Sequence, residues 1–385
     1  MTGFWVLLIV FAAWVWKGGE ILTGALFFMP SLGKYAPAAP PPGGKLQRVS
    51  IILAFRDEPR MEPALRSMLA LDYPDFEVIA VNDRSREEFV RPIRAMDSPH
   101  LKIVDVNELP AGWLGKTHAV CKGYEASSGE WLVFTDADVV FEPDTLKRAV
   151  TMAAEEKLDH IVLFPRLVLK SFWEGAYIPV FIVSFWMFFR PWAARFRRSR
   201  AFVGVGAFNM VRRAAYEKIG THAAFRLEVA EDMVLGKFVK EAGYRQMAGS
   251  GERHIAVRWA EGFRGIVASI RKNAFTGLRY NVAFLALSLS AMLVMNLGPY
   301  AALLAGEGAV RALGAGAVGI IFLIYAAMAA RSGPKYLLYF VFYPVGIVLL
   351  TCLVINSAAA ILRRGGVVWR DTFYPLEELK RNTKL

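Results

Sequence analysis

The chain is poor in cysteine, with Cys121 and Cys352 the only two among 385 residues. Two cysteines in stretches of different character give no disulfide framework, which excludes small disulfide-stabilised folds and fits a reducing compartment. Long tails of one charge sign are absent, as is any module that interleaves aromatic and basic residues. The net charge of +12 therefore indicates attraction to anionic lipid headgroups and phosphorylated substrates. We expect no nucleic-acid partner.

The N-terminus also lacks a basic stretch before its first apolar run, which argues against a cleaved signal peptide. Residues 4–16 read FWVLLIVFAAWVW and continue past Lys17 and Glu20 into ILTGALFFM. One helix within residues 1–30 would be long enough to cross a membrane. Residues 31–47, which include APAAPPPGG, are expected to form a Pro/Gly linker.

Residues 48–275 alternate between short apolar runs and helical patterns. Strands are predicted at 49–55, 77–81, 101–106, 131–135 and 160–165, and helices at 60–71, 116–127 and 143–155. Alternation at this spacing predicts an α/β domain with a mostly parallel sheet covered by helices.

An aromatic and apolar segment at 171–193 interrupts this alternation, and a basic cluster follows it directly. The cluster consists of Arg195, Arg197, Arg198 and Arg200. This combination favours a helix that lies in the membrane interface, and a buried core helix is the alternative.

Residues 276–385 contain three apolar segments, at 281–305, 312–330 and 336–362, each long enough to cross a bilayer, and a basic tail. The first two contain no charged residue, which argues against a transporter or a membrane scaffold that senses nucleotide. Basic residues beside both membrane ends of the α/β domain place that domain in the cytoplasm, and the bacterial inner membrane is the expected location. The basic tail at 363–385 favours the same side, which leaves open a re-entrant or interfacial segment.

Several acidic side chains follow predicted strands or begin predicted helices. Asp136 and Asp138 end the run at 131–135, where open α/β sheets bind ligands, and two carboxylates there suit a divalent cation shared with phosphate oxygens. Asp83 ends the second strand and could accept hydrogen bonds from a base or a ribose. Ordinary surface turns remain the alternative for all three.

Two further patterns point to the same chemistry. Gly112-Trp113-Leu114-Gly115-Lys116 precedes a helix, where glycines and a helix N-terminus favour anions, although the sequence is neither a Walker loop nor a Rossmann fingerprint. Glu231-Asp232 opens another helix. There the helix dipole alone favours acids, and the functional alternative is a general base.

In their order along the chain, these segments resemble the family 2 glycosyltransferases with a GT-A fold, and in particular the membrane-bound subgroup of hopanoid-associated, carotenoid and ceramide glycosyltransferases. The matching segments are IILAFRDE at 51–58, VNDRS at 81–85, GWLGK at 112–116, FTDAD at 134–138, GVGAFN at 204–209, AED at 230–232 and VRW at 257–259. The resemblance extends to Val368-Trp369-Arg370 and Tyr374. It implies a Rossmann-like GT-A catalytic domain over residues 48–275, followed by transmembrane helices.

The resemblance also implies a role for each matching position. Asp232 would be the catalytic base and Glu231 would position it. Asp138 would coordinate Mg²⁺ or Mn²⁺. The nucleotide-sugar would contact Asp83, Lys116, Asp136, Gly204, Gly206, Asn209, Arg258 and Trp259, with the two glycines and Asn209 lining the sugar and acceptor cleft.

The chain departs from the family pattern at several places. Ala54, Asp57 and Asn82 replace a proline, an asparagine and an aspartate, and Asp371 replaces a glycine in the tail. Ile255 replaces the glutamine of the Q-x-x-R-W motif, which weakens a processive polysaccharide synthase as the interpretation. His254 is a second candidate metal ligand, with a structural histidine as the alternative.

We therefore expect a metal-dependent, inverting hexosyltransferase that moves a sugar from a nucleotide-sugar, UDP-sugars first, to a hydroxyl of a membrane lipid. A polyprenyl-phosphate sugar transferase is the alternative, followed by a polysaccharide synthase.

Overall fold

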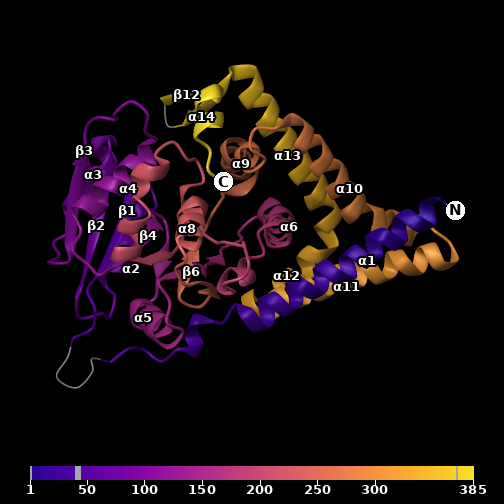
Figure 1. Ribbon diagram of the computed structural model, residues 1–385, viewed down its shortest axis with the longest axis horizontal. Coiled ribbons are helices and arrows are strands. Elements are labelled where there is room, and N and C mark those ends of the chain that lie inside the picture. The colour runs from indigo at the N-terminus through magenta and orange to yellow at the C-terminus, as the bar shows by residue number, and fades with distance from the viewer. Residues whose placement is uncertain (1, 40–44, 370–371) are drawn as a thin grey trace. The chain divides into compact units, whose positions relative to one another are not determined.

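The computed structural model describes residues 2–39, 45–369 and 372–385 (Figure 1). Arg370 and Asp371 of the tail motif, and residues 40–44 of the expected linker, lie outside the described residues. The chain groups into two compact units. One contains residues 29–168, 191–259 and 382–385, here called the α/β unit, and the other contains residues 1–28, 169–190 and 260–381, here called the helical unit.

A seven-stranded sheet forms the centre of the α/β unit, in the order β3-β2-β1-β4-β8-β6-β9. All neighbouring pairs are parallel except those of β8, which runs antiparallel to β4 and β6. The mostly parallel sheet predicted from the sequence is confirmed. Its strands are β1 (Val49–Phe55), β2 (Phe76–Asp83), β3 (Leu101–Val106), β4 (Trp131–Asp136), β6 (His160–Phe164), β8 (Asn209–Arg212) and β9 (Gln246–Ser250).

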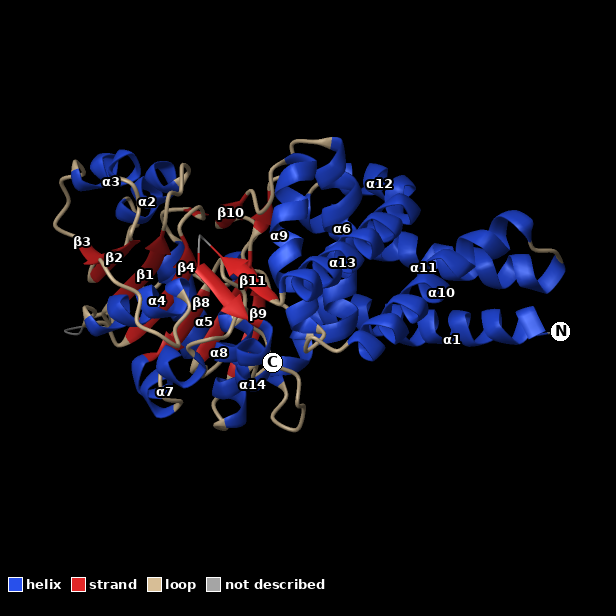
Figure 2. Cartoon of the chain, turned by 90° about the horizontal axis from the view of Figure 1, so that it is seen from above, coloured by secondary structure: helices blue, strands red, loops and turns tan. Residues whose placement is uncertain are grey.

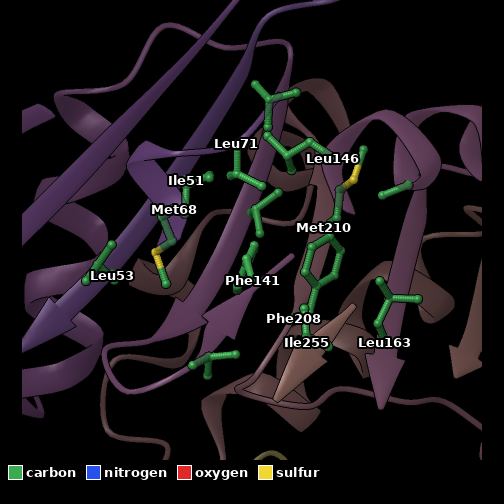
Figure 3. Packing of buried hydrophobic residues seen from close by; sticks show 14 of the residues in the cluster. Ile51, Leu53, Met68, Leu71, Phe141, Leu146, Leu163, Phe208, Met210 and Ile255 are labelled. Carbon is green, nitrogen blue, oxygen red and sulfur yellow. The ribbon is translucent and has the colours of Figure 1, made fainter. Parts of the chain in front are cut away.

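Helices cover both faces of this sheet because successive strand residues point to opposite sides. Ile51 and Leu53 of β1 pack with α2 and α5 in one core, shown close up in Figure 3. Ile52 packs with α4, α7 and α8 in the other core. The helices of this unit are α2 (Met61–Leu69), α3 (Glu87–Arg94), α4 (Gly115–Glu125), α5 (Thr145–Glu155), α7 (Arg213–Lys218) and α8 (Glu231–Glu241), with 3-10 turns η2 (Leu32–Lys34), η3 (Pro191–Arg195) and η4 (His222–Phe225).

A small second sheet, in the order β5-β10-β7, completes the α/β unit. Its strands are β5 (Val140–Phe141), β7 (Arg166–Leu167) and β10 (Ile255–Val257). The register pairs Ile255 with Phe141 and Ala256 with Val140. This pairing fixes where the residues on either side of β10 lie.

The first part of the expected linker belongs to the α/β core. Leu32 and Tyr35 are buried in it, and the Tyr35 hydroxyl donates a hydrogen bond of 2.9 Å to Glu156. Ser31 forms a parallel bridge with Ser250. Residues 31–35 therefore extend the core.

The helical unit consists mostly of long apolar helices; Figure 2 draws these, like all other helices of the chain, in blue. Five segments are long and apolar enough to cross a membrane, at 3–28, 172–195, 282–305, 308–332 and 335–364. The elements are α1 (Thr2–Thr23) with the π-helical turn η1 (Gly24–Phe28), α6 (Phe172–Phe189), α9 (Gly262–Gly277), α10 (Val282–Ala305), α11 (Gly308–Ser332), α12 (Lys335–Tyr339), the 3-10 turn η5 (Phe340–Phe342), α13 (Tyr343–Arg364), α14 (Leu376–Asn382) and the hairpin strands β11 (Gly366–Trp369) and β12 (Thr372–Pro375).

Small residues allow these helices to approach closely, as is common between membrane helices. A Cβ atom at Gly316 would lie 2.6 Å from the Phe11 ring, and one at Gly314 would lie 2.7 Å from the Pro299 carbonyl oxygen. The α1 helix packs against α10 and α11, and the Trp14 indole N–H donates a 2.7 Å hydrogen bond to the Met295 carbonyl. Buried polar groups in this unit are bonded across helices as well, since the Tyr343 hydroxyl donates to the Asn296 amide oxygen.

The α6 helix does not group with the α/β unit, where the sequence analysis placed it. It packs against α9, α12 and α13 of the helical unit. Its glutamate Glu174 is fully buried and accepts hydrogen bonds from the backbone N–H groups of Lys170 and Gly262, at 2.6 and 2.7 Å. An almost wholly apolar helix finds its packing partners among other apolar helices. The interfacial orientation of this helix stays a prediction.

Candidate active site

The carboxyl ends of β2 and β4 bring acidic side chains to one edge of the sheet. Ala54 of β1 pairs with Val81 of β2 on one side and with Asp136 of β4 on the other. Asp83 therefore lies two residues beyond the level of Asp136, at the same end of the sheet. The Asp83 side chain is buried, pairs with Arg84 at 2.8 Å and lies against the start of α4. A Cβ atom at Gly115 would lie 2.6 Å from its carboxylate, so the glycine allows this close approach.

Lys116, in the first turn of α4, joins three elements of the site. Its ammonium nitrogen lies 2.6 Å from Asp136 Oδ1 and 2.8 Å from Glu231 Oε1. Burial alone would lower the pKa of Lys116, but Asp136, Glu231 and Asp232 outweigh it and hold the pKa well above its usual value. The lysine is therefore a permanent cation that connects α4, β4 and α8.

Asp232 follows Glu231 in the first turn of α8. Its Oδ1 atom accepts a 2.8 Å hydrogen bond from the backbone N–H of Met233. Burial and the charge of Glu231 raise the pKa of Asp232 to about 7, against the opposing effect of Lys116. A carboxylate with such a pKa can exchange protons near neutral pH.

The two glycines predicted to line the site lie directly against these acidic residues. A Cβ atom at Gly204 would lie 1.8 Å from the Asp232 carbonyl oxygen, and one at Gly206 would lie 2.5 Å from Asp136 Oδ2. The Asp136 N–H also donates a 2.8 Å hydrogen bond to the Gly206 carbonyl. No larger residue fits these positions without moving the acidic side chains or their backbone.

Asn209 has a different environment from the one expected. It is buried, with 1% of its surface exposed, and its amide nitrogen donates a 3.2 Å hydrogen bond to the Asp232 carbonyl oxygen. Its amide oxygen accepts a hydrogen bond from His160. The side chain therefore supports the backbone at Asp232 from within the core.

Asp138 lies at a second end of the site and is paired with Arg60. The Arg60 guanidinium approaches Asp138 Oδ2 to 2.6 Å and also donates to the Arg258 carbonyl oxygen. Burial and the charge of Asp136 raise the pKa of Asp138 to about 6, although Arg60 acts in the opposite direction. Arg258 and Trp259 directly follow β10, so Arg60 connects this segment to Asp138.

The structure does not bring His254, the other predicted metal ligand, to Asp138. The pairing of β5 with β10 places His254 level with Glu142, whose N–H donates a 2.7 Å hydrogen bond to the His254 carbonyl. The imidazole lies beside Asp144, with 3.7 Å between Nε2 and Oδ1. Burial lowers the pKa of His254. The register of two short strands therefore separates the two candidate ligands.

The residues present fit a divalent cation that is completed by its substrate. Among the described residues, no group of three His, Cys, Asp or Glu side chains is placed to hold a metal ion. Mg²⁺ is commonly bound through one or two carboxylates together with substrate phosphates. The burial of Asp138 and the repulsion between its carboxylate and that of Asp136 favour a cation beside them.

Three residues in or near the site had no signal in the sequence. Arg60 pairs with Asp138, and His160 and Gln246 connect to Asn209. Their partners lie 49 to 198 residues away along the chain, so no local sequence pattern could predict these contacts.

Comparisons with known proteins show which proteins this chain resembles. Residues 50–220 match the family model described as Glycosyl transferase family 2. A stretch of 104 residues is 31% identical to the poly-beta-1,6-N-acetyl-D-glucosamine synthase of Staphylococcus epidermidis, which covers 26% of this chain and 24% of that protein. The chain thus spans about a quarter of the length of the curated relative it matches.

One solved structure shares the fold. The mannosyltransferase PcManGT from Pyrobaculum calidifontis, in complex with GDP-Man and Mn²⁺, superposes with a TM-score of 0.51 at 19% identity, over 93% of this chain and 98% of that one. S. aureus TarS 1–349 in complex with UDP-GlcNAc gives a TM-score of 0.39 at 13% identity, over 86% and 96% of the two chains. Residues 50–220 of this chain therefore form a domain that matches the glycosyltransferase family 2 model, and the fold of the α/β unit is the GT-A fold.

Proposed function

We propose that the chain is an inverting glycosyltransferase that moves a sugar from a nucleotide-sugar to a hydroxyl of a membrane lipid. A hexose is the first candidate for the sugar. The observation that carries the proposal is the cluster of Lys116, Asp136, Glu231 and Asp232. It combines a permanent cation with a carboxylate whose pKa is raised to about 7. Phosphate binding and proton abstraction require these two properties side by side.

The donor end of the site would be formed by Asp83, Lys116, Asp136 and Asp138. Asp83 suits a base or ribose, because it is buried at the end of a parallel strand. Lys116 would bind the diphosphate, and Asp138 with Asp136 would hold Mg²⁺ or Mn²⁺. When bound, the cation would neutralise the charge that develops on the leaving diphosphate. A UDP-sugar is the first candidate donor.

Asp232 would act as the general base. The acceptor oxygen would form a bond to the anomeric carbon while the bond from that carbon to the diphosphate breaks, and the hydroxyl proton would pass to Asp232. One displacement of this kind inverts the anomeric centre. A base with a pKa near the working pH is the most effective, and its contribution is ~10²–10⁴-fold.

A hydroxyl acceptor fits this base better than a phosphate acceptor does. A phosphate monoester already carries negative charge at neutral pH, since its second pKa is about 6, and needs no base. The raised pKa of Asp232 therefore supports a hydroxyl acceptor over a polyprenyl phosphate.

The five long apolar helices support an acceptor that stays in the bilayer. Many of their large apolar side chains are exposed, among them Ile9, Leu287 and Leu304 at 68%, 69% and 79%. Exposed apolar surface on this scale supports a position within a lipid bilayer. The proposed location is the bacterial inner membrane, with the α/β unit in the cytoplasm.

The test is incubation of membranes that contain the protein with UDP- and GDP-sugars and Mn²⁺, followed by mass spectrometry of the extracted lipids. We expect a new lipid of one added hexose mass, absent when Asp232→Asn replaces the native chain. A product found only on polyprenyl phosphate, or only as a water-soluble polymer, would contradict the proposal.

A further inference from the structure

We propose that His160 is a positioning residue for the catalytic base, acting through a buried hydrogen-bond chain that runs from Gln246 through His160 and Asn209 to the backbone of Asp232. The inference rests on the proposed role of Asp232. It concerns three residues on β9, β6 and β8, respectively, which have no contact with the carboxylate itself.

The three side chains that form this hydrogen-bond chain are all buried. His160, Asn209 and Gln246 have 0%, 1% and 1% of their surface exposed. Gln246 Nε2 lies 2.6 Å from His160 Nδ1, His160 Nε2 contacts Asn209 Oδ1, and Asn209 Nδ2 lies 3.2 Å from the Asp232 carbonyl oxygen. Polar groups inside a sheet are costly unless every one has a partner, and here each of these contacts is made.

Backbone partners of Gln246 fix the donor and the acceptor of each hydrogen bond from Gln246 to Asp232. Gln246 Oε1 accepts a 3.0 Å bond from the Val203 N–H, and Gln246 Nε2 donates a 2.9 Å bond to the Gly236 carbonyl. The amide nitrogen therefore faces His160 Nδ1, which has to accept. His160 Nε2 then carries the proton and donates to Asn209, whose own amide nitrogen donates to Asp232.

The hydrogen-bond chain holds two backbone segments together at the place where they cross closely. Residues 203–204 pass over α8, where a Cβ atom at Gly204 would lie 1.8 Å from the Asp232 carbonyl and one at Gly236 would lie 1.8 Å from the Val203 carbonyl. Asn209 bonds the Asp232 end of this crossing and Gln246 bonds the Gly236 end. His160 is the link between the two.

This arrangement sets the position of the first turn of α8, and with it the carboxylate of Asp232. A displacement of about 1 Å in a reacting group can cost ~10²-fold in rate. The loss of His160 therefore acts on the chemical step. Donor binding depends mostly on Asp83, Asp136 and Asp138, which lie at or just after the ends of β2 and β4, so we expect it to change much less than the chemical step.

The experiment compares His160→Leu with His160→Gln in the full-length protein. The glutamine amide can replace the donor at Nε2, whereas leucine cannot. We expect kcat to fall roughly 10- to 100-fold in His160→Leu with the KM for the donor within about twofold of native, and we expect His160→Gln to recover most of kcat. Asn209→Leu should behave like His160→Leu.

Ser50→Ala is the matched control. Ser50 is also fully buried in the sheet and hydrogen-bonded, but it lies near the amino end of β1. The substitution should lower the thermal unfolding temperature without changing kcat. Native kcat in a folded His160→Leu variant would overturn the inference. So would a loss of kcat in His160→Gln as large as that in His160→Leu, or a rise in the KM for the donor as large as the fall in kcat. If Asp232→Asn retains turnover, the proposed base is wrong instead, so the two failures are distinguishable.

Discussion

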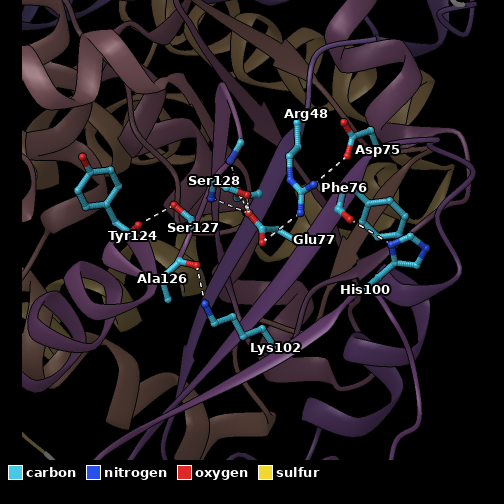
Figure 4. Close-up of polar contacts among 12 residues, drawn as sticks. Arg48, Asp75, Phe76, Glu77, His100, Lys102, Tyr124, Ala126, Ser127 and Ser128 are labelled. Atoms are coloured by element: carbon cyan, nitrogen blue, oxygen red, sulfur yellow. Dashed lines mark hydrogen bonds and ion pairs between the residues drawn. The ribbon is translucent and has the colours of Figure 1, made fainter. Parts of the chain in front are cut away.

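The amino ends and the carboxyl ends of the main-sheet strands, here called the amino edge and the carboxyl edge, both hold partly buried acidic residues. The two groups of residues differ in the direction of their pKa shifts. At the amino edge, Glu77 accepts hydrogen bonds from the Ser50 hydroxyl at 2.6 Å and from the Ser128 N–H at 2.7 Å, and Arg48 lies 3.5 Å away (Figure 4). Burial would raise the pKa of Glu77, but these donors outweigh it and lower the pKa. At the carboxyl edge, burial prevails and raises the pKa of Asp138 and Asp232.

The difference indicates that the supply of hydrogen-bond donors, and not burial alone, decides whether the pKa of a carboxyl group in this sheet is lowered or raised. Glu77 has its lone pairs occupied by the protein's own donors, so it stays ionised and holds strands together. Asp232 shares its cation with Glu231 and Asp136, which take the direct contacts with Lys116. Its carboxylate is therefore suited to receive a proton from a substrate.

The comparison would break most clearly at Asp232. We expect Asp232→Asn to lower kcat by ~10²–10⁴-fold, because the amide cannot accept the acceptor's proton. Binding of nucleotide, measured by calorimetry, should remain near native. Substantial turnover in this variant would show that the carboxyl edge is no more reactive than the amino edge.

Asp138→Asn should have the next largest effect. Loss of one electrostatic contact of this kind costs ~3–4 kcal/mol, so donor binding in the presence of Mn²⁺ should weaken about 10²–10³-fold. Calorimetry with and without Mn²⁺ measures it. His254→Asn is the control, since the structure places His254 beside Asp144, and it should leave Mn²⁺ affinity unchanged. A similar loss in both variants would restore His254 as a ligand.

Glu77→Gln tests the amino edge. We expect it to reduce the free energy of unfolding by ~1–3 kcal/mol, because the neutral amide leaves charge-assisted bonds unmade. Thermal unfolding in detergent measures this, and turnover below the melting range should stay native. Since the pKa of Glu77 is lowered, its stabilisation is present above the ordinary value of 4.5 and is lost as the pH falls below it. The native chain and the variant should therefore converge in acid.

The pH dependence of turnover sharpens the comparison further. Because Asp232 must be deprotonated to act and its pKa is raised to about 7, turnover should rise with pH through that value. Glu231 raises this pKa and Lys116 lowers it. Glu231→Gln should therefore move the acidic limb of the pH–rate profile to lower pH, and Lys116→Met should move it to higher pH. Shifts in the same direction would argue against Asp232 as the titrating group.

Much of the fold could be predicted because most of its strands are short, mainly apolar runs. The segments at 49–55, 101–106 and 131–135 correspond to β1, β3 and β4, and their order with the helices indicated the parallel sheet. The antiparallel strand β8 was missed. It has four residues and follows a glycine-rich segment, so it carries no periodic pattern of its own.

The site was predictable where motif order fixed it and not where tertiary register did. Lys116, Asp136 and Glu231 meet as contacts between three elements, and Gly204 and Gly206 lie beside them. His254 follows the acidic helix in sequence, but the β5–β10 register places it elsewhere. The Asn209 side chain points into the core, which a period-two pattern over four residues could not show.

The crossing of residues 203–204 over α8 also limits how the enzyme could change its acceptor. With glycine at 204 and 236, backbone meets backbone, and there is no side chain between the two segments to shorten or lengthen. Adjustment of the proposed active site to larger or smaller acceptors would then have to come from other parts of the chain. Libraries aimed at acceptor range should leave these two positions untouched and vary their surroundings.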